Sequence, residues 1–105
     1  MSVDKKRETP FDVAPERLFQ AVLRYLRENA SYTNTRDAAA TMEVKTELHP
    51  GFFAYNGDVH FTISPTPSGS LLAVEVHTGP LFVIDWLSFW DRYLVHVTEG
   101  VRSKL

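Results

Sequence analysis

The sequence predicts one two-layer α+β domain, in which two helices cover one face of an antiparallel sheet of about four to five strands. Helical apolar stripes run over residues 15–29 and again after Asp85, and strictly alternating segments fill much of residues 42–78. Because the alternating segments have one apolar and one polar face, both helices are expected on the apolar face. The expected order is β-α-β-β-β-α, with room for one further strand.

Size and composition limit the class of protein. A chain of 105 residues fits a single domain over residues 1–105. Hydrophobic residues at 44% and charged residues at 23% are typical of globular proteins and exclude a disordered or fibrous chain. The absence of cysteine excludes disulfides, thiolate metal sites and thiol catalysis.

Charge and hydropathy limit the partners and the location. A net charge of −2 argues against a general nucleic-acid binder, which needs a basic excess. No apolar run approaches the roughly 18 residues of a membrane span, and residues 1–9 are charged, unlike a signal peptide. We therefore expect a soluble, cytoplasmic protein.

The first two elements are predicted near the N-terminus. Phe11 and Val13 alternate with Pro10 and Asp12, which indicates the end of a strand, and the cations at 5–7 suit a solvated edge or a frayed terminus. Pro15 fits the first turn of a helix, where its missing N–H loses no partner. Apolar residues every three or four positions then predict a helix over 15–29. Residues 30–40 combine loop and strand signals, and both interpretations stay open.

Alternation predicts the central strands. Residues 42–48 form a half-buried strand. One parity stays apolar or aromatic over residues 53–63, apart from Gly57, so we favour a single long strand with a bulge or bend there. A tight hairpin at Asn56-Gly57 is the open alternative. Residues 64–70 are predicted to be a loop, and residues 72–78 the next strand.

Side-chain complementarity predicts the register of the hairpin between these two strands. A turn centred between Pro67 and Ser68 puts apolar pairs on one face and complementary polar pairs on the other, whereas a slip by one residue destroys both matches. The predicted pairs are Ile63–Leu72, Phe61–Val74, Val59–Val76, His60–Glu75 and Asp58–His77.

The C-terminal segment predicts a long helix. Asp85 can cap it, and Gly100 is expected to end or weaken it. Its apolar stripe consists of Trp86, Phe89, Trp90, Tyr93, Leu94, Val97 and Val101.

Both ends of the chain resemble the START/Bet v1-like (SRPBCC) superfamily, in a short version. The run from Thr9 to Phe19 contains Ala14-Pro15-Glu16, similar to the turn that leads from the family's first strand into a helix with an aromatic residue. The aromatic-rich segment from Trp86 to Val101 is similar to the family's long C-terminal helix. The resemblance implies a helix-grip fold, in which a curved sheet wraps the C-terminal helix and encloses an apolar ligand. It carries over no catalytic residue.

Aromatic residues of the C-terminal helix and of the inward sheet face form the candidate ligand site. Small-molecule sites are largely apolar with a few placed polar groups, which this composition fits. The alternative is that the same rings fill the core of a small domain. The candidate ligand-binding residues are Tyr55, Trp86, Phe89, Trp90 and Tyr93, with Thr46 and Thr78 as polar contacts.

The histidines suggest a metal site, but the pattern does not favour one. The predicted register puts His60, His77, Asp58 and Glu75 on the polar face, and imidazole and carboxylate groups are zinc ligands. Cross-strand polar pairs on a solvated surface explain the same residues, and no compact motif such as HExxH is present. We therefore predict no metal and no cofactor.

Three functions remain at this stage. The leading hypothesis is a non-catalytic domain that binds an apolar small molecule or a protein partner through the sheet and the C-terminal helix. The alternative is a homodimerisation or protein-interaction module with a filled core. A cyclase-like enzyme is third, because no nucleophile–base pair, phosphate loop or GxSxG motif is present.

Overall fold

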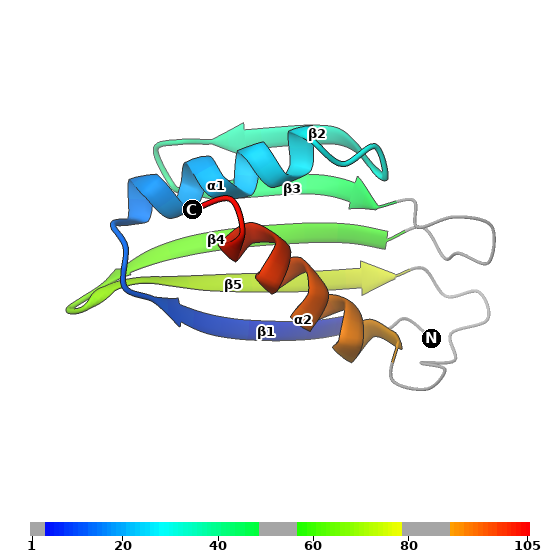
Figure 1. The fold of residues 1–105 in the computed structure, drawn as a ribbon. Coiled ribbons are helices and arrows are strands. Elements are labelled where there is room, and N and C mark those ends of the chain that lie inside the picture. The colour runs from blue at the N-terminus through cyan, green and yellow to red at the C-terminus, as the bar shows by residue number, and fades with distance from the viewer. Residues whose placement is uncertain (1–3, 49–56, 79–88) are drawn as a thin grey trace.

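A computed structural model describes residues 4–48, 57–78 and 89–105 of the chain (Figure 1). Its five described strands form one antiparallel sheet in the order β1-β5-β4-β3-β2. The predicted α+β class is therefore confirmed. The elements are β1 (Asp4–Phe11), α1 (Pro15–Arg27), β2 (Tyr32–Ala38), β3 (Glu43–Leu48), β4 (Gly57–Thr66), β5 (Gly69–Thr78) and α2 (Phe89–Arg102).

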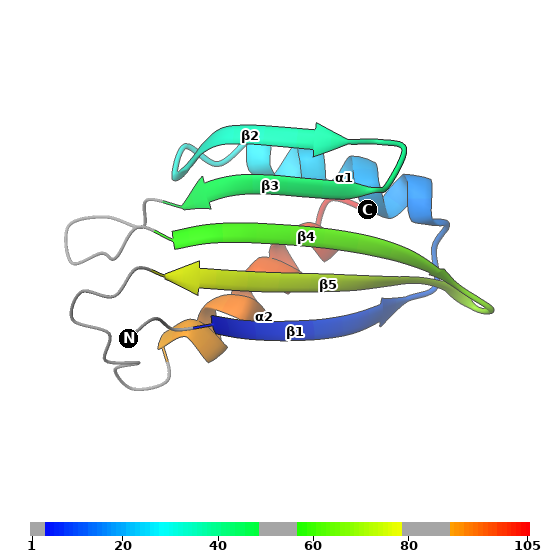
Figure 2. The ribbon, with the colours of Figure 1, turned by 180° about the vertical axis from the view of Figure 1, so that it is seen from behind.

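Both helices lie on the same face of the sheet, as predicted (Figures 1 and 2). Helix α1 follows β1 and precedes β2, and these are the two edge strands, so the chain crosses the whole sheet through α1. Helix α2 contacts α1, β1 and β5. Seen from behind, the other face of the sheet carries neither helix (Figure 2).

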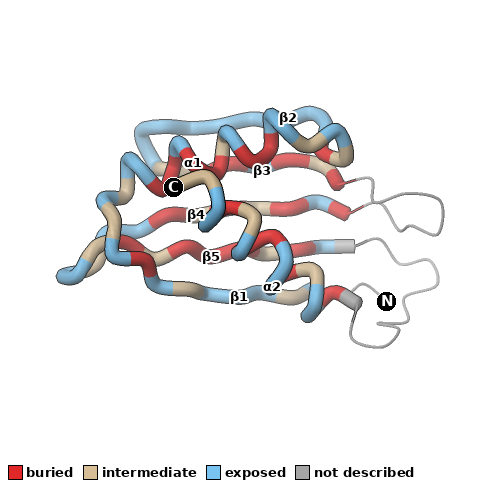
Figure 3. Tube along the Cα trace, viewed as in Figure 1, coloured by how far each residue is buried: buried red, intermediate tan, exposed pale blue. Residues whose placement is uncertain are grey.

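The core lies between the helices and the sheet (Figure 3). Pro15 occupies the first turn of α1, and the stripe that begins at Leu18 and Phe19 faces the sheet. On the sheet, the alternating apolar residues of β3, β4 and β5 pack against the helices and complete the core. The most deeply buried side chains include Leu18, Val22, Val44, Val59, Phe61, Leu72, Val74, Val76, Trp90, Val97 and Val101.

The β4–β5 hairpin has the predicted register, with all five predicted pairs in place. The loop predicted over residues 64–70 is wrong, because β4 continues to Thr66 and β5 begins at Gly69. Proline is tolerated at position 65 because the ladder between β3 and β4 ends at Thr62, so no neighbour on that side needs its N–H. The hydroxyl of Ser70 donates to the carbonyl of Val13 at 2.8 Å and fixes the turn to the start of α1.

The structure decides the conformation of two regions for which the sequence allowed two interpretations. Residues 32–38 of the ambiguous segment form the edge strand β2. Gly57 pairs with both Leu48 and Thr78, so it is a strand residue, and the tight hairpin at Asn56-Gly57 is wrong. The ladder is regular from Gly57 onward; the predicted strand over 53–56 and the cap Asp85 lie outside the described residues.

Gly100 permits the close crossing of the two helices. A Cβ atom at this position would overlap Cε1 of Tyr25, at a separation too short for any real contact. The expectation that Gly100 ends the helix is wrong, because α2 continues to Arg102. Its small size instead lets the Tyr25 ring pack against the α2 backbone.

We expect Gly100→Ala to lower the free energy of unfolding by about 1–2 kcal/mol, measured by urea denaturation. Overpacking against the Tyr25 ring outweighs the gain of up to about 1 kcal/mol that alanine brings to a helix. In a Tyr25→Ala background the same substitution should stabilise, because the ring is gone. An equal loss in both backgrounds would show that the ring is not the cause.

Candidate functional site

The candidate site lies where β2 begins and α2 starts. Tyr32 is the first residue of β2, and Tyr93 lies near the start of α2. Their hydroxyl oxygens are 2.5 Å apart, and either phenol can be the donor. This hydrogen bond ties the C-terminal helix to the edge strand.

Two further rings complete an aromatic cluster, which consists of Tyr25, Tyr32, Trp90 and Tyr93. Tyr25 of α1 meets Tyr32 edge to face, with ring centroids 5.8 Å apart. Trp90 meets Tyr93 in the same manner at 5.6 Å and is only 1% exposed. Edge-to-face rings gain from the attraction between a ring edge and a ring face. Side chains of α1, β2 and α2 therefore meet around one buried hydrogen bond within the apolar core.

Burial keeps the paired phenols protonated. Burial raises the pKa of Tyr32 far above its ordinary value, and the neighbouring Tyr93 phenol raises it further. Burial also raises the pKa of Tyr93, although its hydrogen bond with Tyr32 acts in the opposite direction. Tyr25 also forms a side-chain hydrogen bond with Tyr32, which raises the pKa of Tyr32 further. The three phenols hold three hydroxyl hydrogens, and the two bonds among them use two. The third hydrogen can be donated to another acceptor.

Thr46, predicted as a polar contact, has another role. Its hydroxyl is 2.9 Å from that of Thr35 and donates to the carbonyl of Thr33 at 3.1 Å. The register between β2 and β3 shifts between Thr33 and Arg36, a bulge at which Asn34 has a φ of 52°. The buried Thr46 hydroxyl therefore secures the bulge of β2, whereas the aromatic cluster takes its polar groups from tyrosines.

The structure brings two predicted site residues together, Trp90 and Tyr93. Phe89 begins α2, but its side chain and that of Thr78 lie outside what is described, as do Tyr55 and Trp86.

Sequence reasoning missed Tyr25 and Tyr32. Tyr25 follows Val22 by three positions and Leu18 by seven, so the helical stripe contained a signal for it. Tyr32 opens a strand that is otherwise exposed, and nothing in its neighbours marks it as buried.

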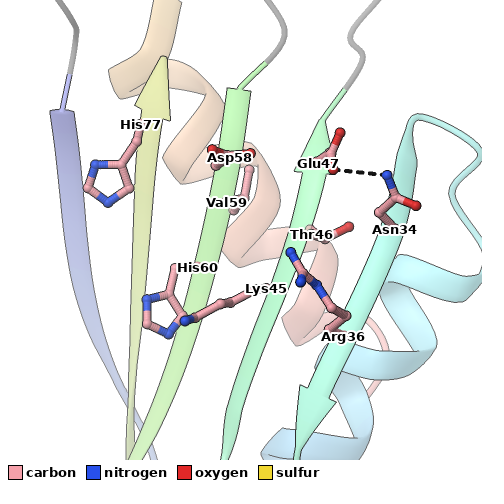
Figure 4. Close-up of a pocket in the computed structure, with 9 residues that line it drawn as sticks. All are labelled: Asn34, Arg36, Lys45, Thr46, Glu47, Asp58, Val59, His60 and His77. Atoms are coloured by element: carbon pink, nitrogen blue, oxygen red, sulfur yellow. Dashed lines mark hydrogen bonds between the residues drawn. The ribbon is translucent and has the colours of Figure 1, made fainter. Parts of the chain in front are cut away.

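The uncovered face of the sheet carries an open groove of about 290 Å³ (Figure 4). The predicted histidines lie here, each beside a carboxylate. His60 Nε2 is 3.0 Å from Glu43 Oε1, and His77 Nδ1 is 2.8 Å from Asp4 Oδ1. The residues that line the groove are Asn34, Arg36, Lys45, Thr46, Glu47, Asp58, Val59, His60 and His77, of which Thr46 and Val59 turn their buried side chains to the other face.

The histidines take part in cross-strand polar pairs. The hydrogen bond with Asp4, followed by the charges of Asp4 and Glu75, raises the pKa of His77 above its ordinary value. Hydrogen bonds from Thr41 and His60 lower the pKa of Glu43. Within residues 4–48, 57–78 and 89–105, no group of three or more His, Asp or Glu side chains could hold a metal ion.

A second hollow of about 320 Å³ lies beside α1 and the C-terminal residues. Neither of these two hollows lies between α2 and the sheet. There the inward side chains of α2 are packed and almost inaccessible; they are Trp90, Leu94, Val97 and Val101. The residues around the second hollow are Arg17, Gln20, Ala21, Arg24, Arg27, Lys104 and Leu105.

Comparison with known proteins gives a fold likeness. No protein-family model and no curated protein matches the chain. The protein TTHA0849 from Thermus thermophilus is 11% identical with a TM-score of 0.54, over 99% of this chain and 96% of that chain. The protein CV1439 from Chromobacterium violaceum is 14% identical with a TM-score of 0.48, over 96% and 93%. The likeness to TTHA0849 shows a shared fold over nearly the whole of both chains.

Neither described helix is long and apolar enough to cross a membrane.

We expect Tyr32→Phe and Tyr93→Phe each to lower the free energy of unfolding by about 1–2 kcal/mol, because each leaves a buried hydroxyl without its partner. The double variant should lose clearly less than the sum, because both changes remove the same hydrogen bond. Thr98→Val is the matched control, since its buried hydroxyl donates to the carbonyl of Leu94 within α2 and takes no part in the Tyr32–Tyr93 bond. Additive losses in a double-mutant cycle would contradict the bond.

The same pair predicts sensitivity to alkali. The pKa values of Tyr32 and Tyr93 are raised in the folded state, so their contribution is complete below an unfolded pKa of about 10 and is lost as the pH rises above it. Unfolding free energies measured at increasing pH above about 10 should fall more steeply for the natural protein than for the double Tyr→Phe variant. Parallel slopes would show that other groups cause the loss.

Proposed function

We propose that this chain is a non-catalytic binding domain of the START/Bet v1-like (SRPBCC) kind, which takes a small, mainly apolar molecule that carries one hydrogen-bond acceptor. The molecule would bind beside the aromatic cluster, where α2 starts over the sheet. The observation that carries the proposal is the hydrogen-bonded pair Tyr32–Tyr93 within this cluster of rings.

The fold supports the assignment to this superfamily. Both helices cover one face of the antiparallel sheet, and α1 connects its two edge strands. Helix α2 packs across that face, as the helix-grip arrangement requires (Figure 1). Together with the strand–Pro15–helix opening, this arrangement agrees with the resemblance in the sequence. A cytoplasmic location belongs to the same proposal.

The chemistry supports the type of ligand. Aromatic side chains favour binding of the apolar part of a ligand, and a few polar groups of the protein fix the orientation of that ligand. The phenols stay protonated because they are buried, so they offer a donor rather than a base. A carbonyl or ether oxygen would accept the one phenol hydrogen that the bonds among Tyr25, Tyr32 and Tyr93 leave over.

One observation favours a second candidate function, a protein-interaction module with a filled core. The inward side chains of α2 from Trp90 to Val101 are at most 3% exposed, so this part of the layer is already packed. On this view the aromatic cluster only stabilises the fold, and partners bind at the surface.

Matched probes distinguish the two functions. 2-Acetylnaphthalene has one carbonyl acceptor, whereas 2-ethylnaphthalene has nearly the same shape without it. By isothermal titration calorimetry we expect both to bind, and the acetyl compound to bind about tenfold more tightly, as one hydrogen bond provides. Tyr93→Phe should reduce this preference, and the Thr98→Val control should preserve it.

Binding of neither probe, together with no copurified small molecule in native mass spectrometry, would overturn the ligand hypothesis in favour of the filled-core module. Equal affinity for the two probes would overturn the role of the phenol pair.

A further inference from the structure

The uncovered face of the sheet carries two parallel rows of acidic, basic and imidazole side chains, part of which Figure 4 shows. Register pairs place Asp4, His77, Asp58 and Glu47 side by side in a first row. Two residues further along each strand, a second row contains Lys6, Glu75, His60 and Lys45, and Arg36 of β2 extends it. Two residues of a strand span about 7 Å, so the rows are distinct but adjacent.

The two rows are complementary strand by strand. The first row is acidic except on β5, where it carries His77. The second row is basic except on β5, where it carries Glu75. Because both exceptions fall on the same strand, each of these four strands pairs a carboxylate with a lysine or a histidine. The pairs are Asp4 with Lys6, His77 with Glu75, Asp58 with His60, and Glu47 with Lys45.

We propose that this face binds the same face of a second copy of the chain, through a two-fold axis that lies between the rows at right angles to the strands. This rotation places each strand over its own counterpart and the first row of one copy over the second row of the other. Glu47 would face Lys45 of the second copy, and Asp58 would face its His60. Each contact occurs twice, as in an isologous dimer.

Other arrangements are disfavoured. A two-fold axis parallel to the strands would place the acidic row on itself, and like charges in contact repel. Edge-to-edge pairing is opposed at both ends of the sheet. Strand β1 carries Lys5, Lys6 and Arg7 near its start and Pro10 near its end, and β2 has its bulge at Asn34.

The existing side-chain contacts leave charges for such a partner. Lys45, Arg36 and Asp58 are exposed, and none of them forms an ion pair within the described residues. They lie at the centre and on the β2 side of the face, along the groove. The central strands matter most, because the twist of each sheet separates the outer strands of two stacked sheets.

The size of the face fits a weak dimer. Five strands about 4.8 Å apart and about eight residues long give a face of at most about 650 Å² per copy, or at most about 1,300 Å² buried in total, since the outer strands separate. This area is at the low end for stable complexes, and the contacts are polar and hydrated. We therefore expect a dissociation constant of about 10–100 μM.

Sedimentation equilibrium with charge-reversal variants tests this dimer. The natural protein should dimerise at low salt and dissociate between about 0.01 M and about 1 M salt, as the Debye length falls from about 30 Å to about 3 Å. Lys45→Glu and Glu47→Lys should each weaken self-association about tenfold or more, since each creates two repulsive contacts. Mixed together, the two variants should form a heterodimer, because one copy then supplies two carboxylates and the other two ammonium groups.

Arg17→Glu is the matched control, because it changes the charge as Lys45→Glu does but lies on α1, over the other face. It should leave self-association unchanged, and circular dichroism checks that every variant is folded. A natural protein that stays monomeric at several times the expected dissociation constant overturns the proposal. So does a dimer that both reversals leave unchanged, or a mixture that does not associate. Ligand binding lies on the opposite face of the sheet, so these outcomes are independent of it.

Discussion

The register of the β4–β5 hairpin is the constraint on which both faces of the sheet depend. It places Phe61 opposite Val74 on the inner face, which the helices cover, and Asp58 opposite His77 on the outer face, which they leave uncovered. Because side chains alternate with a period of two, a slip by one residue would turn the apolar set to solvent and the charges into the core. The turn at Pro67 and Ser68 and the bond from Ser70 to Val13 hold this register in place.

Two helices that approach each other closely are needed to bury the apolar inner face of the sheet. Helix α1 spans from one edge strand to the other, and α2 crosses it where Gly100 leaves space for Tyr25. The same ring then meets Tyr32, whose hydroxyl bonds to Tyr93. Packing and the hydrogen-bonded phenols of the proposed binding site are therefore parts of one arrangement, so we expect the Tyr→Phe substitutions to affect both stability and the proposed binding.

Side-chain spacing within each segment predicted the fold class and both helices. The matching of apolar and polar pairs between two segments predicted the register of the central hairpin. Side-chain spacing failed at residues 64–70, where turn-forming residues masked strand ends that pair across the hairpin. For the candidate site, the stripe of the last helix pointed to Trp90 and Tyr93. It could not supply Tyr32, because the burial of that residue depends on α2, 61 positions further along the chain.

In the proposed division of the sheet, which the hairpin register sets, the layer under the helices binds a ligand and the uncovered face binds a second copy. Intermolecular nuclear Overhauser effects with 2-acetylnaphthalene test this division most directly. We expect contacts from the acetyl methyl protons to the rings of Tyr32 and Tyr93. Contacts confined to outer-face residues such as Lys45 and His60 would contradict it.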